Sequence, residues 1–341
     1  MPKTKLDKFI DKMMKSKKKF PYKQYTSEQL KSEVKKLQKY STKKLITKSQ
    51  VKKFANDFKY AGKILFTIEP ARVGNIVSDY FFQSERMKAR MGAHPSPISQ
   101  WKNPKSRRRL FNGMVKLNKK KLEYNEPQLR ASMRLYFSMT PQFKVSVAKC
   151  IYDKYKPSVV LDFSAGWGDR LAGFYGSKYP ETYIGIDPNE HLKMSYSCMK
   201  KFLNKIIPDK TVKMIYKPAE KVHMRVPVDL IFTSPPYFDL EHYSDSKTQS
   251  DVAYDNVETW LDNFLFTFLD NNLCKLKSSG HLILQISDYN TKSKERVNIV
   301  KPLQDYMKSL KNFRYKGIIL VKTKGRRSKF ITEPLFVWQK K

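Results

Sequence analysis

Residues 159–171 read VVLDFSAGWGDRL, a short apolar run followed by a turn of small residues and the start of a helix-like stretch. The run from Val159 to Phe163 predicts a buried strand, and the small residues after it allow the backbone to approach a ligand closely. A helix that begins directly after such a turn presents free N–H groups. In doubly wound α/β sheets the first strand-to-helix turn is a ligand site. Because a tight turn needs the same residues, Gly-x-Gly alone is a weak signal.

The alternation of strands and helices continues through the rest of the chain. Apolar strands are predicted at 159–163, 183–187, 212–216, 228–233 and 281–287, and helices at 143–155, 171–175, 191–206, 257–276 and 297–310. This alternation predicts a mostly parallel sheet with helices on both faces. Two further strands, 315–321 and 335–338, are joined without a helix, which predicts an antiparallel hairpin at one edge. We therefore expect a Rossmann-like α/β domain with a seven-stranded sheet.

An acidic residue, Asp187, ends the second predicted strand. At this position a carboxylate can accept both ribose hydroxyls of a nucleoside cofactor. Pro188 follows and is favoured in the first turn of a helix, so Asp187 could also serve as a helix N-cap. The two roles are compatible, and the ribose contact is the favoured interpretation.

The most informative motif is Thr233-Ser234-Pro235-Pro236-Tyr237, directly after the fourth predicted strand. Two consecutive prolines neither continue a ladder nor start a helix comfortably, so they fix an extended turn at the carboxyl end of the strand. There the Ser234 hydroxyl and the Pro235 carbonyl can both accept hydrogen bonds from one amino group, which aims the nitrogen lone pair at a methyl sulfonium. Tyr237 offers a face on which a flipped base can stack. The alternative is a Pro-rich loop that merely ends a strand.

Together these motifs resemble those of a known enzyme family. The region from about residue 135 to the end, about 60% of the chain, resembles the family of S-adenosylmethionine-dependent amino methyltransferases that act on DNA bases. The resemblance implies a Rossmann-like methyltransferase fold, with S-adenosylmethionine as cofactor. It implies catalytic roles for Ser234, Pro235, Pro236 and Tyr237. It implies cofactor contacts for Thr140, Pro141, Asp162, Ser164, Ala165, Gly166, Trp167, Gly168, Asp187, Pro188, Ala219 and Glu220.

Three details of the resemblance concern particular segments. Thr140-Pro141 is similar to the family's segment that contacts the methionine carboxylate, and Ala219-Glu220 falls loosely where the family contacts the adenine. The serine at Ser234 slightly favours cytosine N4 over adenine N6 as the target, because the Asp and Asn forms of the tetrapeptide are commoner among adenine enzymes of the family.

The order of the motifs bears on domain organisation. The subgroup in which the cofactor motif comes first usually carries a target-recognition domain at its C-terminal end. Here only 104 residues follow Tyr237, and the remaining strands and helices need them. We therefore expect recognition by the N-terminal region, and divide the chain into a basic helical arm (1–60), a basic accessory region for target recognition (61–134) and a methyltransferase domain (135–341).

The charge of the chain points to a polyanionic partner. Lys and Arg total 68 against 31 Asp and Glu, a net charge of +37. Residues 1–140 hold 35 basic and 10 acidic side chains, so most of the excess is N-terminal. Such asymmetry is typical of a phosphate-binding region, and DNA is the expected partner, with RNA as the alternative. A Lys-rich solvated surface encoded by an AT-rich genome, such as that of a large virus, accounts for part of the charge.

Other sequence features argue against a metalloprotein, a disulfide-bonded protein and a membrane or secreted protein. Cys150, Cys198 and Cys274 are far apart and lack metal-ligand spacing, so we expect no metal site and no disulfide framework. There is no apolar run of transmembrane length and no signal peptide, which predicts a soluble, intracellular protein without a membrane partner. The sequence does not predict the oligomeric state.

Three other functions remain as alternatives. An RNA or tRNA base methyltransferase would use the same tetrapeptide chemistry. Protein glutamine methylation uses a similar Asn-Pro-Pro-Tyr, but the serine at Ser234 and the basic charge argue against it. The third alternative is not an enzyme but a nucleic-acid-binding protein with a vestigial methyltransferase fold. The intact pair of motifs argues against such a loss of catalytic activity.

Overall fold

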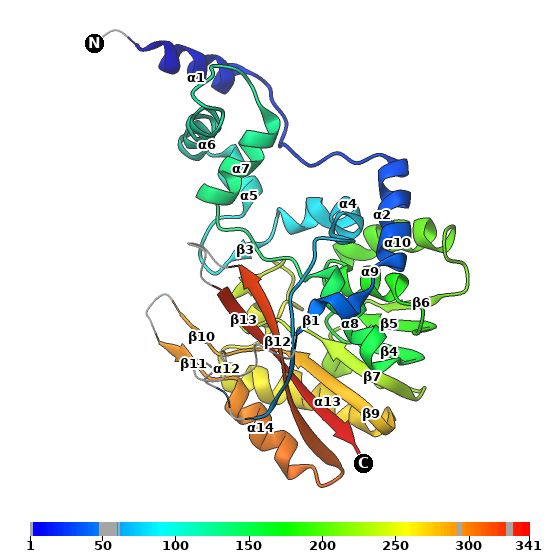
Figure 1. Ribbon diagram of the computed structural model, residues 1–341. Helices are drawn as coiled ribbons and strands as arrows, with labels where there is room; N and C mark the ends of the chain where they lie inside the picture. The colour runs from blue at the N-terminus through cyan, green and yellow to red at the C-terminus, as the bar shows by residue number, and fades with distance from the viewer. Residues whose placement is uncertain (1–2, 48–59, 61, 292–294, 325–329) are drawn as a thin grey trace. The chain divides into compact units, whose positions relative to one another are not determined.

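The computed structural model describes residues 3–47, 60, 62–291, 295–324 and 330–341 (Figure 1). The chain divides into two compact units, and each is assembled from segments that are far apart in sequence. The first unit comprises Met1–Gln24, Gln83–Pro141 and Glu241–Ser244, and the second comprises Tyr25–Phe82, Gln142–Leu240 and Asp245–Lys341.

The first unit is mainly helical. Its elements are α1 (Lys5–Lys15), β3 (Arg90–Met91), α5 (Pro97–Lys102), α6 (Pro104–Leu117), α7 (Glu126–Tyr136) and β8 (Glu241–His242), and α4 (Asn75–Arg86) ends in it. The local sequence starts these helices: Thr4 and Asp7 form a capping box before α1, and Asn103 caps α6. Apolar side chains of α1, α5, α6 and α7, including Ile10 and Leu110, form its core.

The two units divide the chain differently from the three segments expected from the sequence. Ile10 of α1 packs with α5, α6 and α7, in the first unit. Val34 and Leu37 of α2 (Ser27–Lys39) belong instead to the core of the second unit. The boundary after Gln24 therefore falls inside segment 1–60, because its two amphipathic helices bury their apolar faces in different cores.

The second unit contains the sheet and the remaining helices. Its N-terminal elements are α2, η1 (Thr42–Leu45), β1 (Ile46–Thr47) and β2 (Ile64–Ile68). The central elements are α8 (Val145–Tyr155), β4 (Val159–Asp162), α9 (Asp169–Gly176), β5 (Thr182–Ile186), η2 (Glu190–Leu192), α10 (Lys193–Asn204), β6 (Thr211–Ile215), η3 (Ala219–Lys221) and β7 (Val228–Thr233). The C-terminal elements are α11 (Ser250–Ala253), α12 (Val257–Trp260), the π-helical η4 (Leu261–Phe266), α13 (Thr267–Asn272), η5 (Leu273–Lys275), β9 (Leu276–Gln285), β10 (Tyr289–Asn290), β11 (Arg296–Val297), α14 (Val300–Ser309), β12 (Phe313–Lys324) and β13 (Phe330–Lys340).

The sheet has the strand order β1-β2-β12-β13-β9-β7-β4-β5-β6. Strand β4 pairs in parallel with β5 and β7, β5 pairs in parallel with β6, and β7 pairs in parallel with β9. Strand β13 is antiparallel to both β9 and β12. These pairings confirm the predicted Rossmann-like α/β fold with a mostly parallel sheet and an antiparallel hairpin.

The number of strands and the place of the hairpin differ from the prediction. Within the part of the chain that the structure describes, the sheet has nine strands, because β2 pairs in parallel with β12 and β1 pairs antiparallel with β2. The hairpin of β12 and β13 is therefore covered by β2 and does not form the edge. The physical reason is the apolar run 64–68, which buries Phe66 and Ile68 in the core once it is paired.

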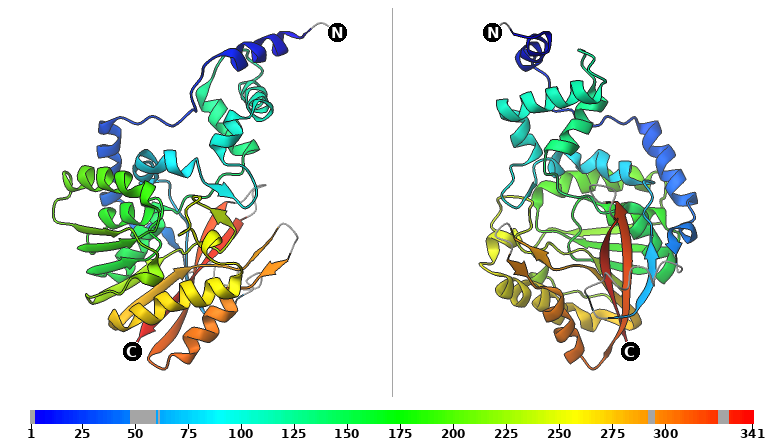
Figure 2. Two further views of the ribbon diagram at one scale, coloured as in Figure 1. Left: turned by 180° about the vertical axis from the view of Figure 1, so that it is seen from behind. Right: turned by 60° about the vertical axis from the view of Figure 1, so that its left-hand side comes forward.

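Helices cover both faces of the sheet, as Figures 1 and 2 show. Successive strand residues point to opposite faces, so Val160 and Leu230 lie in one core cluster while Leu161 and Ile231 lie in the other. The first cluster includes side chains of α2, α8, α9 and α10, and the second includes side chains of α12, α13 and α14. Burial on both faces explains why the central strands are continuous apolar runs.

Candidate functional site

The strand order reverses direction between β4 and β7. From β4 the chain proceeds outward through β5 to β6, then returns to β7 on the other side of β4. In doubly wound sheets the crevice outside the carboxyl ends of the strands at such a switch point binds ligands. The small-residue turn follows β4 and the Ser-Pro-Pro-Tyr loop follows β7, so both sequence motifs leave the sheet at this point.

A buried hydrogen bond joins the two strand ends. Thr233, the last residue of β7, donates its hydroxyl to an Asp162 carboxylate oxygen at 2.7 Å, and Asp162 is the last residue of β4. Both side chains are fully buried. The hydrogen bond fixes the start of the Ser-Pro-Pro-Tyr loop against the start of the small-residue turn.

Asp162 is the centre of a larger polar network. The Arg170 Nε donates to it at 2.7 Å and the Tyr183 hydroxyl at 2.5 Å. Although burial opposes the charge of Arg170, the Asp162 carboxylate raises the pKa of that guanidinium above its usual value. Burial and the same carboxylate hold the pKa of Tyr183 well above normal. Asp162 is thus engaged by protein groups on every side, and it positions the two turns.

Sequence reasoning assigned no role to Arg170, Tyr183 or Thr233. Arg170 and Thr233 lie in the quoted motifs and Tyr183 in a predicted strand, but only the folded sheet brings the three side chains to Asp162. One signal was available: a charged residue such as Arg170, in the first turn of a helix that is buried throughout, needs a partner.

The small-residue turn has two glycines with left-handed backbone, Gly166 at φ 60° and Gly168 at φ 70°. A side chain at Gly168 would meet the Phe82 ring at 2.7 Å, so this glycine is required for packing. A Cβ at Gly166 would meet nothing nearer than the Ser164 carbonyl oxygen at 3.8 Å. The turn therefore has open space at Gly166, where a ligand can approach the backbone.

Asp187 holds this turn in place. One carboxylate oxygen accepts the Gly166 N–H at 2.7 Å, and the other accepts the Asn189 N–H at 2.9 Å. Tyr196 donates to the Gly166 carbonyl at 2.8 Å. Because each carboxylate oxygen has two acceptor sites, Asp187 keeps the capacity to bind further hydroxyls. The Asn189 contact closes a local turn, and the helical turn η2 that follows is capped by Asn189, whose side chain accepts the His191 N–H at 3.1 Å. The helix N-cap role expected of Asp187 is therefore wrong, because Asn189 holds that position.

The electrostatics of Asp187 are unusual for a surface turn. Its side chain is 8% exposed, and burial raises the pKa of the carboxyl to about 6, against the two N–H donors that lower it. A buried carboxylate with a raised pKa, beside an open backbone turn, is the pattern expected of a binding site.

The tetrapeptide loop combines rigidity with strain. Pro235 is buried, while Ser234, Pro236 and Tyr237 are half-buried. Phe238, the next residue, has a left-handed backbone with φ 42°, which costs about 1–3 kcal/mol for a residue with a side chain. Strained backbone of this kind clusters at functional sites.

The side chains of the loop differ in how they are held. The Tyr237 hydroxyl donates to the Gln285 carbonyl at 3.4 Å, and the ring packs beside the core cluster of α12, α13 and α14. Among the residues that the structure describes, none forms a hydrogen bond with the Ser234 hydroxyl. The Ser234 oxygen thus retains its acceptor capacity.

The remaining predicted cofactor residues fall into three places. Ser164, Ala165 and Trp167 belong to the small-residue turn, with Ala165 buried and Trp167 packed beside the core. Ala219 and Glu220 begin η3, and the Glu220 carboxylate accepts the Tyr254 hydroxyl at 3.0 Å. Pro188 directly follows Asp187.

Thr140 and Pro141 end the segment Gln83–Pro141 of the first unit, and their role as cofactor contacts stays a prediction. Thr140 is buried, and its hydroxyl has no hydrogen-bond partner within the described residues. Gln142, the next residue after them, belongs to the second unit. Its amide donates to Asp169 at the start of α9 at 2.9 Å.

Two features of the described residues bear on the expectations about metals and membranes. Across 3–47, 60, 62–291, 295–324 and 330–341, no three His, Cys, Asp or Glu side chains are grouped so as to hold a metal ion. In the same ranges, every helix is too short or too polar to cross a membrane.

Comparisons with known proteins give low similarity. No family model and no curated protein matches the sequence. TrmN from Thermus thermophilus is 14% identical over 58% of this chain and 49% of its own, with a TM-score of 0.38. An rRNA methylase from Streptococcus thermophilus is 12% identical over 59% of this chain and 98% of its own, with a TM-score of 0.34. The chain spans about half the length of TrmN, and the chemistry proposed below rests on the residues of the site.

Proposed function

We propose that this protein transfers a methyl group from S-adenosylmethionine to the exocyclic amino group of a nucleic-acid base, with cytosine N4 in DNA slightly favoured over adenine N6. The observation that carries the proposal is the Thr233–Asp162 hydrogen bond. It joins a cofactor-type turn and a Ser-Pro-Pro-Tyr loop at one switch point of the sheet. Two turns with complementary chemistry at a single ligand crevice support one reaction.

The residues of the small-residue turn fit a nucleoside cofactor. Gly166 leaves open space at the backbone, and the Asp187 carboxylate beside it retains acceptor sites for two ribose hydroxyls. Ala219 and Glu220, after β6, would line the adenine, and the contact of Thr140 and Pro141 with the methionine carboxylate stays an expectation from the resemblance. When bound, the cofactor supplies an electrophilic methyl group on a sulfonium.

The loop residues would hold the target amine. The Ser234 hydroxyl and the Pro235 carbonyl each accept one amine hydrogen, which localises the nitrogen lone pair for attack on the methyl carbon. The methyl group that the bound cofactor supplies would pass to this nitrogen with loss of its bond to sulfur, and the amine would give up one proton to solvent. Because these contacts strengthen as the nitrogen leaves planarity, they favour the transition state over the ground state. Tyr237 supplies a face for the extruded base.

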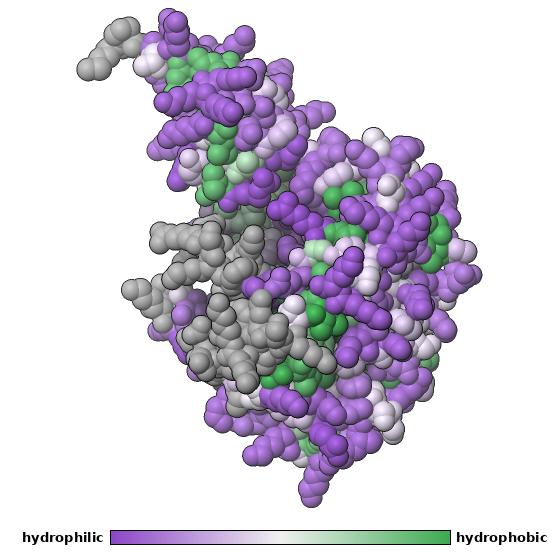
Figure 3. All heavy atoms as spheres, in the orientation of Figure 1, coloured by the Kyte–Doolittle hydropathy of each residue, from purple (hydrophilic) through white to green (hydrophobic). Residues whose placement is uncertain are grey.

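The first unit would supply most of the affinity for the polymer. It holds 23 basic and 6 acidic side chains. Hydrophilic residues cover most of the visible surface around α1, α6 and α7 (Figure 3). The turn after α6 presents three exposed lysines, and two of them, Lys119 and Lys120, have left-handed backbones with φ 52° and 62°. A charge excess of this size suits contacts to phosphates, which position the polymer without reading its sequence.

Replacing Asp187 by alanine is expected to weaken cofactor binding by about 1.5–3 kcal/mol, as for loss of hydrogen bonds to a charged group. Loss of the Gly166 contact adds to this by loosening the turn. Calorimetric titration with S-adenosylmethionine measures the change. An unchanged dissociation constant in a folded variant would remove Asp187 from the site.

The pH dependence of cofactor binding gives a second test of Asp187. Burial favours the protonated carboxyl of Asp187. Its contribution to the free energy of unfolding is therefore fully present below pH 4 and is lost as pH rises through about 6. Hydroxyl donors bind the ionised form, so cofactor affinity should rise as pH increases through about 6 and then level off. Asp187→Asn, which cannot ionise, should bind weakly and without this rise. A wild-type affinity that is flat from pH 5 to 7.5 would contradict this.

The contribution of the first unit is expected in the salt dependence of nucleic-acid binding. Replacing Lys119, Lys120 and Lys121 by alanine should reduce the slope of log affinity against log salt by roughly 1–3, because up to three fewer counterions are released. The control replaces Lys200, Lys201 and Lys205, which are exposed lysines in and just after α10. Anisotropy titrations at several salt concentrations give both slopes. Equal slopes for the two variants would mean that the turn after α6 is only a solvated surface.

Label transfer tests the proposed function itself. The full chain is incubated with methyl-labelled S-adenosylmethionine and, separately, with duplex DNA, single-stranded DNA and RNA, and label retained in polymer is counted. Label in either DNA sample supports the proposal, and label in RNA alone would move the substrate to RNA. Calorimetric cofactor binding without label in any polymer would contradict it.

A further inference from the structure

A cavity of about 950 Å³ lies in the second unit, at the opposite end of the sheet from the site described above. It is lined where α8 and α9 end and before β5 begins, with Lys156 and Glu181 among its residues. Parallel strands place their amino ends together, so a strand length, about 13 Å for β4, separates this cavity from the switch-point crevice. The switch-point residues named above are not among its lining residues.

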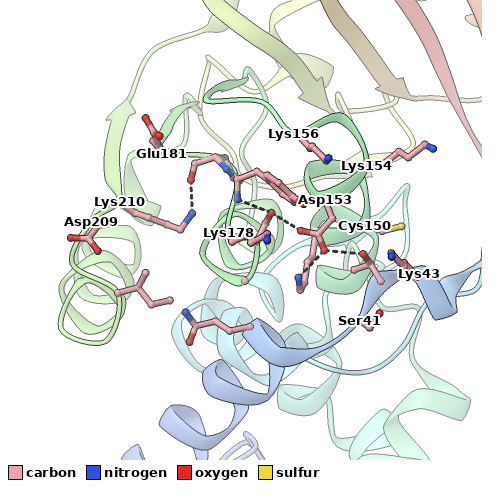
Figure 4. Close-up of a pocket in the computed structure, with 18 of the residues that line it drawn as sticks. Ser41, Lys43, Cys150, Asp153, Lys154, Lys156, Lys178, Glu181, Asp209 and Lys210 are labelled. Atoms are coloured by element: carbon pink, nitrogen blue, oxygen red, sulfur yellow. Dashed lines mark hydrogen bonds and ion pairs between the residues drawn. The ribbon is translucent and has the colours of Figure 1, made fainter.

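Lysines from separate segments line this cavity (Figure 4), and the Lys154 side chain points to the side, over the Phe66 ring. Four of them, Lys43, Lys154, Lys156 and Lys178, are exposed. Within the residues that the structure describes, none of these four ammonium groups forms an ion pair. Cations near a helix C-terminus are ordinary, which accounts for Lys154 and Lys156 at the end of α8. It does not account for Lys43 in η1 or Lys178 after α9.

The carboxylates of the cavity do not neutralise these lysines. Asp153 is already occupied, because it accepts from Lys149 at 2.8 Å, the Thr42 hydroxyl at 2.8 Å and the Ser177 hydroxyl at 2.6 Å. Glu181 accepts from a serine hydroxyl at 3.1 Å. With Asp209 the cavity has three carboxylates against six ammonium groups, so its charge is positive.

Three contacts hold lysine side chains in place before an anion binds. Lys156 and Lys178 both lie over the Tyr179 ring, with their ammonium nitrogens 5.3 and 5.2 Å from its centroid. Lys210 is buried at the side of the cavity and donates to the Pro180 carbonyl. Its burial lowers its pKa to about 8, so an anion that enters would stabilise its charged form. Ordering of the side chains before binding reduces the entropy lost when an anion binds.

We propose that this cavity binds a small anion with two or more phosphate groups. Several separated ammonium groups around one hollow match a chain of phosphates better than a single phosphate. The volume lies within the range of small-molecule sites, about 300–1,000 Å³. The lysines lie around one hollow, which favours a free oligophosphate or nucleotide over the backbone of a polymer, which needs a groove that follows it.

Calorimetric titration of the full chain with sodium tripolyphosphate, at fixed ionic strength, tests the proposal. Lys156→Ala combined with Lys178→Ala should weaken binding at least tenfold. The matched control, Lys200→Ala with Lys201→Ala on α10, makes the same charge change outside the cavity and should bind like wild type. All four lysines are exposed, so both variants should fold.

Three results would overturn the proposal: no binding of tripolyphosphate to wild type, equal weakening in both variants, or no weakening in the cavity variant. A short single-stranded oligonucleotide forms a second arm. If the cavity variant loses affinity for the oligonucleotide and not for tripolyphosphate, the polymer backbone is the ligand and the proposal fails. S-adenosylmethionine affinity should be unchanged in both variants, which separates this outcome from failure of the switch-point site.

Discussion

Replacing Ser234 by alanine is expected to lower the single-turnover rate of methyl transfer by about 10²–10³-fold, the usual effect of removing one hydrogen bond aimed at a transition state. The hydroxyl has no hydrogen-bond partner within the described residues, so its loss should leave the fold unchanged. KM should change less than kcat, because the contact strengthens as the amine leaves planarity. Single-turnover methylation is measured alongside calorimetric cofactor titration.

Variants of Tyr237 provide the matched control for this loop. Tyr237→Ala should weaken capture of the base by about 1–3 kcal/mol through loss of a stacking surface. Tyr237→Phe keeps the ring that would stack on the base and loses the long contact to the Gln285 carbonyl, so it should retain most activity. Cofactor affinity should survive both changes. Wild-type turnover in Ser234→Ala and Tyr237→Ala, or a joint loss of cofactor binding, would mean that the loop is scaffold.

Replacing Asp162 by alanine is expected to reduce the free energy of unfolding by about 3–5 kcal/mol, because the change leaves the Arg170 guanidinium buried without its partner. The Tyr183 and Thr233 hydroxyls lose the same acceptor. Asp162→Asn retains the shape and part of the hydrogen bonding, so its loss should be smaller. Urea unfolding, followed by circular dichroism, measures all three proteins.

A surface ion pair provides the comparison for Asp162. Asp305 pairs with Lys301 at 2.7 Å, and both side chains are well exposed. Asp305→Ala should change stability by less than about 1 kcal/mol. If Asp162→Ala is no more destabilising than Asp305→Ala, the buried network does not hold the two turns together, and the geometry assigned to the site is wrong.

The central sheet could be predicted because its strands are buried on both faces. Continuous apolar runs such as 159–163 and 228–233 mark such strands, and the intervening helices exclude an all-β fold. The β12–β13 hairpin followed from two apolar runs without a helix between them. These features are local, so the sequence alone carries them.

The outer strands could not be predicted, because their pairing is not local. Strand β2 (Ile64–Ile68) pairs with β12, about 250 residues later in the chain. No local sequence pattern indicates which strand it pairs with. The helix predicted at 257–276 is broken by the π-helical turn Leu261–Phe266 and ends at η5. Single extra residues of this kind leave the apolar periodicity almost unchanged.

The candidate site was predictable only where its residues are contiguous in the sequence. The turn around Gly166 and the loop around Ser234 are contiguous motifs, and their convergence followed from parallel strands that share one edge. The network of Asp162 with Arg170, Tyr183 and Thr233 depends on four separate elements, so it required the fold. The prediction that Asp162 contacts the cofactor stays untested, and its burial favours a positioning role.

Identification of the methylated nucleoside tests the central claim most directly. DNA and RNA treated with the protein and methyl-labelled S-adenosylmethionine are digested to nucleosides and analysed by mass spectrometry, with Ser234→Ala as the control. The account predicts label on an exocyclic amine, as N4-methylcytosine or N6-methyladenine, and its loss by about 10²-fold or more in the variant. Label on a ring carbon, a ring nitrogen or a ribose oxygen, or an equal yield from Ser234→Ala, would contradict it.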